Sequence, residues 1–420
     1  MSAPSPIDGG KPVTIIGAGF SGLVTAFYLV RAGFRVQIHE RAERAGGLIA
    51  TKKESFGLVE TAANGLLNSA YVEDLFSTID LPLEPTLKEA RRRYIFRDGE
   101  PRRWPLSFGG TVSVIWFVLR SIFFKALVRP RDGETVSNWA DRVLGEEASR
   151  YLVSAALQGI YAGDPSRMSA SLIFGRFFQP KKMASKPNVR GTVTAPEGMG
   201  QLIEKLKTYL EKTGVEFHLQ SEIESVSEKP SHPLVIATSA SQAAVLLKEF
   251  DPVRADACAS VELLPIVAVT VSTARPPKTQ GFGCLFPPVE KRRALGVLMN
   301  NFIFANRATR GFCENWIFGG ALNQVPDLLK RSDQEIVKLV KEERDAAFAT
   351  NSEILDASIT RWPAALPHYT TELEKALPKI KGLRQNVLLI GNYVGTIGLA
   401  KILESAATVP DEISEKGEWS

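Results

Sequence analysis

The sequence predicts an α/β protein in which a parallel-sheet domain, assembled from discontinuous segments, stands beside an antiparallel-sheet domain and a helical insertion. Three observations predict this class. Residues 13–40 show a strand, a glycine-rich turn, a helix and a second strand. Residues 262–320 carry several short strand patterns separated by turns. Residues 104–131 combine an apolar run with a basic end.

The first strand and its turn contain three glycines with separate roles. Val13–Ile16 is apolar and β-branched, which predicts a buried strand. Gly17 permits the tight turn that follows, and Gly19 lets the backbone approach a pyrophosphate. Gly22 lets the next helix lie close to the strand. This spacing is typical of a dinucleotide-binding, Rossmann-like fold.

The helix and the strand that follow complete the motif. Phe20–Arg31 carries apolar residues at helical spacing, and Gly33 is placed to end the helix. The helix N-terminus presents free N–H groups and the positive end of the helix dipole to a phosphate. The next strand, Arg35–His39, is followed by Glu40, whose carboxylate is placed to accept a hydrogen bond from a ribose hydroxyl. A glycine-rich turn of purely structural use would not need this carboxylate.

A second glycine pair indicates which dinucleotide binds. The stretch ERAERAGGLIAT places Arg44 and the pair Gly46 and Gly47 shortly after Glu40. A second backbone turn can therefore touch the pyrophosphate, and Arg44 can neutralise its charge. This extension resembles the FAD-binding half of the amine oxidase and protoporphyrinogen oxidase superfamily, whose nucleotide domain is of the glutathione-reductase type. The resemblance implies FAD as the cofactor.

Composition excludes several classes of protein. A chain of 420 residues with 44% hydrophobic and 23% charged residues is globular, with enough core for one large or two medium domains. Cys258, Cys284 and Cys313 lack metal-binding spacing, so we expect a reducing compartment and no metal site. The N-terminal stretch MSAPSPIDGGKP has neither the pattern of a signal peptide nor that of a transit peptide. We therefore expect a bacterial cytoplasmic protein.

The segment from Lys88 to Arg131 concentrates positive charge. It holds eleven Lys or Arg and three Asp or Glu, whereas the whole chain has a net charge of +5. Its run from Trp104 to Leu119 is uncharged but shorter than the roughly 20 apolar residues of a spanning helix. Aromatic residues beside cations suit a monotopic anchor on anionic lipid, at the inner face of the cytoplasmic membrane. A buried helix with solvated cations is the alternative, and nucleic acid is not an expected partner.

Three segments, residues 1–85, 191–260 and 384–420, are expected to build the FAD-binding domain. Residues 86–190 form the helical, membrane-associating insertion, and residues 261–383 form the substrate-binding domain with its antiparallel sheet. Further helices are expected near residues 198–214, 241–250, 333–349 and 370–380. Further strands are expected near residues 215–220, 222–226, 234–240, 264–272, 357–362 and 386–390.

The last motif, IGNYVGTIGLAKILESA, resembles the C-terminal flavin motif of the same superfamily. Gly391 and Asn392 fill its Gly-acid position, and the asparagine keeps a hydrogen bond to ribitol or phosphate without adding charge. Ile397, Gly398 and Leu399 would then meet the isoalloxazine end. No cysteine lies near this motif, where the covalently flavinylated amine oxidases attach their cofactor, so FAD is expected to be bound without a covalent link.

Four stretches resemble the protoporphyrinogen oxidase family more narrowly: residues 159–177, 281–307, 361–369 and the closing GNYVG. The likeness covers nearly the whole chain in the same order. It implies oxidation of protoporphyrinogen IX to protoporphyrin IX, with dioxygen as acceptor, in heme biosynthesis. Oxidation of coproporphyrinogen III is the near alternative. Amine oxidation, carotenoid desaturation and a catalytically inactive flavin- or tetrapyrrole-binding protein are the further ones.

The resemblance also assigns substrate contacts. Arg93 matches an arginine that pairs with a substrate propionate, with Arg91 or Arg92 in its place if the register shifts by one. Asn64 matches a position at the flavin edge. The remaining assigned contacts are a pocket-lining glycine, Gly163, and three apolar residues that enclose the tetrapyrrole, Leu285, Leu298 and Phe318.

The resemblance assigns a larger set of residues to the cofactor, and it leaves a homodimer open as the assembly state. Because the flavin carries the redox chemistry, no catalytic side chain is assigned. The set comprises the two glycine turns, the acid and its neighbours, the loop around Asn64 and the closing motif: Gly17, Ala18, Gly19, Phe20, Ser21, Gly22, Glu40, Arg41, Arg44, Gly46, Gly47, Leu48, Ala62, Ala63, Asn64, Gly65, Ile223, Trp362, Gly391, Asn392, Ile397, Gly398 and Leu399.

Overall fold

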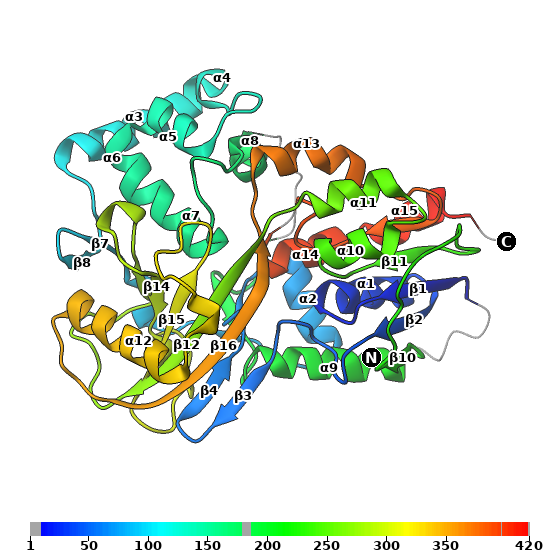
Figure 1. Ribbon diagram of the computed structural model, residues 1–420, viewed down its shortest axis with the longest axis horizontal. Coiled ribbons are helices and arrows are strands. Elements are labelled where there is room, and N and C mark those ends of the chain that lie inside the picture. Colours follow the sequence, from blue (N-terminus) through cyan, green and yellow to red (C-terminus); the bar gives the residue numbers. More distant parts are fainter. Residues whose placement is uncertain (1–9, 179–185, 396, 419–420) are drawn as a thin grey trace.

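The computed structural model describes residues 10–178, 186–395 and 397–418. Its first sheet has five parallel strands in the order β10-β2-β1-β11-β17 (Figure 1). Segments far apart in the chain supply these strands, because β1 begins at residue 12 and β17 ends at residue 389. Their bounds are Pro12–Ile16 for β1, Arg35–Glu40 for β2, Glu216–Leu219 for β10, Leu234–Ile236 for β11 and Val387–Leu389 for β17.

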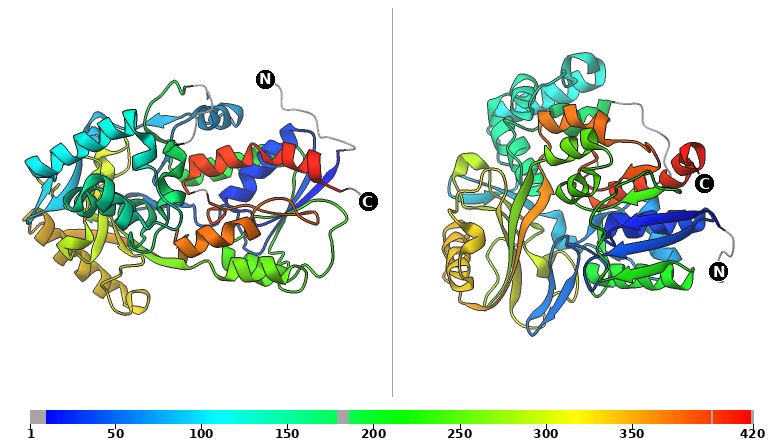
Figure 2. Two further views of the ribbon diagram at one scale, coloured as in Figure 1. Left: turned by 90° about the horizontal axis from the view of Figure 1, so that it is seen from above. Right: turned by 45° about the vertical axis from the view of Figure 1, so that its right-hand side comes forward.

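Helices cover both faces of this sheet (Figure 2). One face packs against α1 (Phe20–Arg31), α2 (Ala70–Thr78), α9 (Met199–Lys212), α14 (Leu399–Ala406) and α15 (Val409–Lys416). The other face packs against α10 (Ala240–Leu247), α11 (Pro252–Ala259) and α13 (Thr371–Ile380). The near-continuous apolar strands are those of a parallel sheet buried on both sides.

The second sheet has seven strands in the order β16-β12-β15-β14-β13-β7-β8. All neighbouring pairs are antiparallel except β13 and β7, which are parallel. Helix α12 (Asp333–Phe348) covers one face. The strand bounds are Arg93–Arg97 for β7, Glu100–Arg102 for β8, Leu263–Thr273 for β12, Gly283–Leu285 for β13, Ala294–Leu298 for β14, Phe312–Gly319 for β15 and Ile354–Pro367 for β16.

Two small sheets and several short helices connect these units. The hairpin of β3 (Thr51–Glu54) and β4 (Gly57–Glu60) is antiparallel. Three short strands, β5 (Leu66–Leu67), β9 (Thr192–Thr194) and β6 (Glu84–Pro85), form the other small sheet. Single turns of helix occupy Lys88–Arg91, Ser149–Val153, Gly175–Phe178, Pro288–Glu290, Asn300–Phe302 and Leu328–Lys330.

The helical insertion lies at one edge of the molecule, where α3 and α4 are outermost (Figure 1). Its helices are α3 (Phe108–Phe123), α4 (Lys125–Val128), α5 (Val136–Leu144), α6 (Glu146–Ala148), α7 (Ser154–Tyr161) and α8 (Ala170–Phe174). In α3 only Gly110 is buried. Phe108 is 87% exposed and Phe123 72% exposed. The alternative expectation of a buried helix is therefore wrong.

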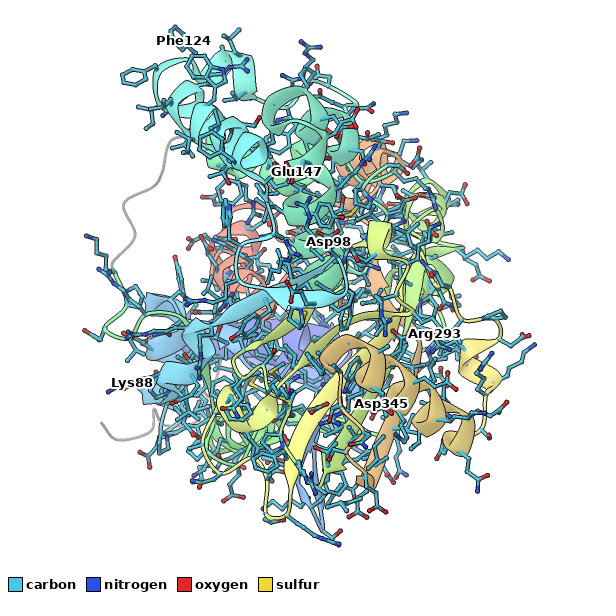
Figure 3. All side chains as sticks on the ribbon, turned by 90° about the vertical axis from the view of Figure 1, so that its left-hand side faces the viewer. Lys88, Asp98, Phe124, Glu147, Arg293 and Asp345 are labelled. Atoms are coloured by element: carbon cyan, nitrogen blue, oxygen red, sulfur yellow. The ribbon has the colours of Figure 1, made fainter. Side chains whose placement is uncertain are left out.

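We call the exposed apolar side chains of this segment the α3–α4 apolar face. Phe124, at the outer end of α3, projects away from the rest of the chain (Figure 3). None of the helices in the described residues is long and apolar enough to cross a membrane. The face comprises Trp104, Phe108, Val112, Ile115, Trp116, Val118, Leu119, Ile122, Phe123, Phe124 and Leu127.

The mixed α/β fold agrees with the sequence expectation, and the helix at residues 20–31 has the predicted bounds. The strand expected near residues 222–226 is wrong: this stretch is irregular, and Val226 N–H donates instead to the carbonyl of Leu246. The sequence did not reveal α11 or α15 as separate helices. Residues 1–9, on which much of the leader-peptide expectation rests, lie outside the described residues. The domain bounds stay a prediction.

Candidate functional site

The first glycine turn closes the gap between β1 and α1. Gly17 has φ +104°, a left-handed conformation that favours glycine. A Cβ on Gly22 would lie 2.0 Å from the carbonyl oxygen of Gly17, so no larger residue fits there. A Cβ on Gly19, by contrast, would meet no atom within 4 Å. Gly19 therefore borders open space, as expected of a turn that receives a phosphate.

The second glycine pair packs against this first turn. The N–H of Gly46 donates to the carbonyl of Ala18 at 2.8 Å. Gly46 has φ +111° and Gly47 has φ +58°. The guanidinium of Arg44 donates to the carbonyl of Gly47 at 2.8 Å and to two further carbonyls of the same turn. Arg44 thus stabilises the turn, a role that the sequence did not suggest.

Two helix N-termini that the sequence assigned to the cofactor lack a side-chain cap. Gly19 precedes α1 and Gly398 precedes α14, and neither helix has an acidic residue in its first turn. The two helices are in contact, and Ser21, Gly391 and Ser405 help to line a cavity between them. Free N–H groups and positive dipole ends favour an anion. The open space at Gly19 and the uncapped N-terminus of α1 fit the pyrophosphate of a dinucleotide.

Glu40 lies at the end of β2 beside the turn. Its carboxylate accepts hydrogen bonds from the N–H of Ala18 at 2.8 Å and the N–H of Ala42 at 2.9 Å. Each oxygen keeps a lone pair for a further donor, such as a ribose hydroxyl. Arg41 is exposed and contacts Gln242 at 3.4 Å. Glu40 is thus well placed for the predicted contact, whereas Arg41 lies in solvent.

The loop after β4 connects the glycine turns to the second sheet. The indole N–H of Trp362, on β16, donates to the carbonyl of Thr61 at 2.7 Å. The Thr61 hydroxyl donates in turn to the carbonyl of Leu48 at 2.7 Å. The structure therefore brings Leu48, Trp362 and the loop from Ala62 to Gly65 into one region. Ile223, by contrast, lies half-buried among the residues packed under α10 and α11.

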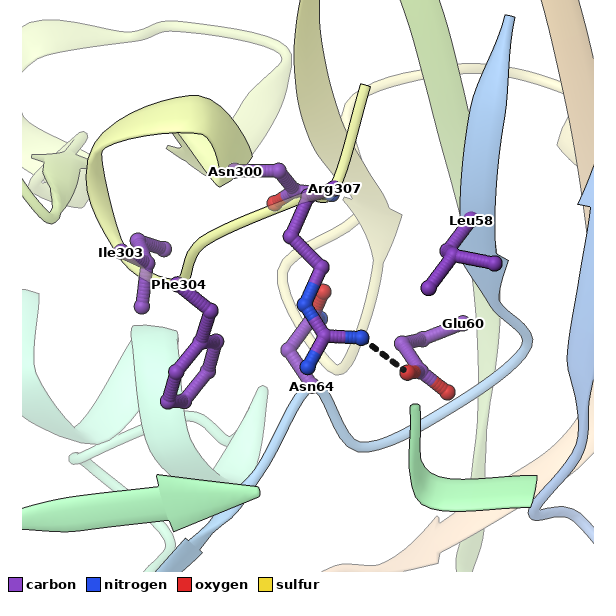
Figure 4. A pocket seen from close by; sticks show the side chains of 7 residues that line it. All are labelled: Leu58, Glu60, Asn64, Asn300, Ile303, Phe304 and Arg307. Atoms are coloured by element: carbon purple, nitrogen blue, oxygen red, sulfur yellow. Dashed lines mark ion pairs between the residues drawn. The ribbon is translucent and has the colours of Figure 1, made fainter. Parts of the chain in front are cut away.

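A buried ion pair lies beside Asn64 (Figure 4). Arg307 Nη1 and Glu60 Oε1 are 3.6 Å apart, and both side chains are only 4% exposed. Arg307 Nη2 also donates to the carbonyl of Ala195 at 2.9 Å. With Asn64 and Asn300 the pair lines a small cavity, and the Nε and Nη1 groups of Arg307 have no hydrogen-bond partner in the described residues. Such groups have room for a water or a cofactor atom beside them.

Burial raises the pKa of Glu60, because a carboxylate loses hydration inside the protein. The hydroxyl of Thr51 and the N–H of Met199 both donate to it, at 2.7 Å and 2.9 Å, and act in the opposite direction. Sequence reasoning missed Glu60 and Arg307 as site residues. Nothing in either local pattern could have paired residues this far apart in the chain.

One face of the second sheet carries most of the assigned substrate contacts. Directly paired residues of neighbouring strands share a face. Arg93 pairs with Gly283, which pairs with Leu298, so these residues form one row across three strands. In the next row Leu285 packs against Gly159 of α7, where a Cβ would lie 2.3 Å from the leucine. Arg93, Leu285 and Leu298 thus lie on the face that meets α7.

Arg93 is exposed at the edge of this face. Its guanidinium lies 4.4 Å from the ring centre of Phe282. Stacking on an aromatic ring occupies the face of a guanidinium and leaves the N–H groups at its edge available for a carboxylate. The geometry therefore suits the assigned contact with a propionate.

Phe318 does not lie on this face. It is fully buried in the core beneath α12, together with Val297 and Ile336. Because side chains alternate along a strand, its neighbour Ile317 points to the opposite face, in register with Gly296. Phe318 therefore does not lie on the face that carries Arg93, Leu285 and Leu298, and Ile317 lies on that face instead.

The end of α7 brings Gly163 to the same face. Ala162, the residue before it, packs in one cluster with Ile317 and Trp362. A Cβ on Gly163 would lie 2.6 Å from the sulfur of Met168, so the site has no room for a side chain. In the closing motif, the hydroxyl of Tyr369 donates to the carbonyl of Asn392. Ile397 and Leu399 are half-buried.

Comparisons with known proteins agree with this geometry. The sequence model of the family described as "Flavin containing amine oxidoreductase" matches residues 20–406. Chloroplastic protoporphyrinogen oxidase of Nicotiana tabacum is 27% identical, over 98% of this chain and 87% of its own. Coproporphyrinogen III oxidase of Bacillus subtilis (strain 168) is 23% identical, over 97% of each chain. Cyclohexylamine oxidase from Brevibacterium oxydans IH-35A has a similar fold, with a TM-score of 0.71 at 17% identity over 96% of this chain and all of its own.

Gly19→Ala should separate folding from cofactor binding. The added methyl group meets no protein atom, so thermal stability should stay at the wild-type level, but it occupies the space left for a phosphate. We expect at least about tenfold weaker flavin binding by the apoprotein, equivalent to roughly 1.4 kcal/mol. Gly109→Ala, in exposed α3, is the matched control. Wild-type flavin affinity in Gly19→Ala would contradict the assigned phosphate turn.

Arg307→Met should lower the free energy of unfolding by about 3–5 kcal/mol, because it leaves the buried Glu60 without its partner. Adding Glu60→Gln should recover part of this loss, as measured by denaturant unfolding. Burial raises the folded-state pKa of Glu60, so the folded Arg307→Met variant binds more protons than its unfolded chain. Its stability should therefore fall as pH rises above the ordinary pKa of a glutamate. A double variant less stable than Arg307→Met would show that the pair does not act as one unit.

Proposed function

Because the chain belongs to the family of flavin-containing amine oxidoreductases, its cofactor is a flavin, and we propose that it is an FAD-dependent porphyrinogen oxidase. The proposed reaction converts protoporphyrinogen IX to protoporphyrin IX with dioxygen as acceptor. The observation that carries the proposal is the sheet face on which an apolar wall ends at the exposed guanidinium of Arg93. The relative from Nicotiana tabacum supports it.

The chemistry of this face matches the shape of the substrate. A porphyrinogen is broad and apolar, and it carries propionate groups at its rim. Leu298 and Ile317 offer half-buried apolar side chains on this face, next to Leu285, which packs against Gly159 of α7. A guanidinium binds a carboxylate through two parallel hydrogen bonds, which fixes orientation as well as affinity.

The protein would bind and orient, whereas the cofactor supplies the redox chemistry. When bound, a flavin accepts hydride from a substrate carbon and passes the electrons to dioxygen, giving hydrogen peroxide. In the proposed site the uncapped N-terminus of α1 would hold the pyrophosphate, Glu40 would hold the ribose, and the start of α14 would face the ring system. Asn64 and Trp362 flank the ring system. FAD is held without a covalent bond, so acid should release all of it from the polypeptide.

Coproporphyrinogen III is a second candidate substrate. The relative from Bacillus subtilis that matches 97% of each chain acts on it by name. Coproporphyrinogen carries more propionates than protoporphyrinogen, and Arg91 and Arg92 lie next to Arg93 to meet them. The two substrates differ in the number of carboxylates that the protein must bind.

Anaerobic mixing tests the proposal directly. The flavin-loaded protein should lose its visible flavin absorbance when mixed with protoporphyrinogen, and regain it with porphyrin fluorescence when air is admitted. Faster bleaching by coproporphyrinogen would select the second candidate. Bleaching by an amine but by neither porphyrinogen would show an amine oxidase, and no bleaching by any of these would indicate an inactive binding protein.

Arg93→Ala should raise KM for the porphyrinogen with a smaller effect on kcat. A propionate far from the reacting carbon contributes mostly uniform binding. A charge-assisted pair contributes roughly 1.5–3 kcal/mol, so kcat/KM should fall about ten- to hundredfold. Lysine should restore only part, and the flavin spectrum should not change. Should Arg91→Ala or Arg92→Ala damage kcat/KM while Arg93→Ala leaves it within about twofold, the propionate contact would move to that residue.

We also propose that the α3–α4 apolar face docks the protein on the inner surface of the cytoplasmic membrane. Single exposed apolar residues are ordinary, but a contiguous helical face of this size beside basic residues suits an interfacial anchor on anionic lipid. Arg120, Lys125, Arg129 and Arg131 supply the charge next to this face.

Trp116→Glu should weaken binding to vesicles that contain anionic lipid by about tenfold, because it places a charge in the centre of the α3–α4 apolar face. Added salt should weaken wild-type binding as well. Vesicle flotation measures both effects. Val253→Glu, an equally exposed valine on α11, is the matched control and should bind like the wild type. Equal flotation of both variants at all salt concentrations would contradict the proposed membrane anchor.

A further inference from the structure

We propose that His368 and Glu262 act together as positioning residues for the turn after α7, and thereby set the affinity for the tetrapyrrole. This inference rests on the proposed function, because it takes the face beside Gly163 as the substrate site. Neither side chain needs to touch the substrate. They act through the backbone of Asp164, the residue next to Gly163.

His368 joins the turn to the end of β16. Its side chain is fully buried. Its Nε2 accepts a hydrogen bond from the backbone N–H of Asp164 at 3.0 Å. Its Nδ1 lies 3.0 Å from Oε2 of Glu262. An Nε2 that accepts from an amide requires the proton on Nδ1, which therefore donates to Glu262. With both nitrogens occupied in this way, His368 orients the turn and does not serve as a base.

Glu262 keeps this tautomer in place. Partial burial opposes its ionisation, but hydrogen bonds from His368 and Arg167 lower the pKa of Glu262, so the carboxylate stays charged. Arg167 Nη2 lies 2.8 Å from the same oxygen, Oε2. Gly163 begins the turn and Arg167 follows it in sequence. The Glu262 carboxylate therefore holds the turn at both ends, directly through Arg167 and, through His368, at Asp164. The remaining charged group at the turn, Asp164, accepts from the N–H and hydroxyl of Ser166.

The turn has little freedom apart from these contacts. Ala162 adopts φ +52°, a left-handed conformation in which a non-glycine residue is strained. Its carbonyl accepts from the N–H of Ala321 at 2.8 Å, directly after β15. A Cβ on Gly163 would lie 3.2 Å from Cδ2 of the His368 ring. The imidazole thus packs against Gly163 and also accepts the hydrogen bond from the next backbone N–H, that of Asp164.

Loss of the imidazole would affect binding more than folding or cofactor retention. Without an acceptor, the half-buried N–H of Asp164 would lose its hydrogen bond, and the backbone next to Gly163 would lose its link to the end of β16. The flavin contacts at Gly19, Glu40 and Gly391 lie on other elements and should not change. Substrate affinity is therefore the quantity that should respond.

The experiment compares His368→Leu, His368→Gln and Glu262→Ala in the flavin-loaded protein. Protoporphyrin binding is measured by fluorescence quenching, and KM and kcat are measured separately. We expect His368→Leu to weaken porphyrin binding about tenfold and to raise KM with kcat nearly unchanged. Gln offers an acceptor to Asp164 and should restore most of the affinity. Glu262→Ala should weaken binding about threefold, and the double variant His368→Leu with Glu262→Ala should be no weaker than His368→Leu alone.

His218→Leu and Glu216→Ala are matched controls, because this exposed pair lies on β10 outside the sheet face. Equal porphyrin affinity in the wild type and His368→Leu would overturn the inference, as would strictly additive losses in the double variant. If His368→Leu does not fold, Glu262→Ala still decides the point, because Glu262 is 40% exposed and its removal leaves no cavity. A wild type that binds no porphyrin, while still binding flavin, would instead refute the proposed function.

Discussion

The close contact between Gly22 and the carbonyl of Gly17 is the constraint on which the nucleotide end of the molecule depends. It brings α1 so near to β1 that the helix N-terminus opens directly at the turn. Gly19 can then border open space, and the second turn can pack on the first through the amide of Gly46. A single methyl group at residue 22 would push these elements apart, and no contact elsewhere could restore the arrangement.

The second sheet is coupled to this end through specific contacts with the β3–β4 hairpin and the loop that follows it. Trp362 on β16 donates to the loop that follows β4, and Arg307 pairs with Glu60 at the end of β4. Both contacts reach the loop that carries Asn64. The proposed substrate face on one sheet and the proposed cofactor site on the other are thereby held in fixed relation. Loss of either contact should loosen the site without unfolding either sheet.

Local sequence patterns predicted much of the fold for physical reasons. The glycine spacing and the strand after it specify β1, α1 and β2 almost residue by residue, because turn, cap and dipole all act within a few residues. Long-range features escaped this reasoning. The pair of Arg307 with Glu60 has no local signature. The bonds from His368 to Asp164 and Glu262 likewise join segments that only the folded chain brings together.

Phe318 shows what a resemblance in sequence does not specify. It was assigned by resemblance alone, but the face on which a residue of β15 lies depends on the partner strand, and the pairing of β14 with β15 shifts between Ala294 and Gly296. A shift of one residue moves a side chain to the opposite face. The sequence favoured an exposed anchor for α3 but left a buried helix as the alternative, because apolar residues are typical of a helix covered by protein and of one that faces lipid. The outcome depends on which elements pack nearby.

The order of strands in the parallel sheet has a consequence for synthesis on the ribosome. β1 lies between β2 and β11, so its second edge stays unpaired until the chain has grown from Ile16 to Leu234. At about 5–20 residues per second, this interval lasts roughly 10–45 s. During that time a strongly apolar strand edge is open to other nascent chains. The protein should therefore depend on chaperones that shield the growing chain early, long before the flavin can help to stabilise it.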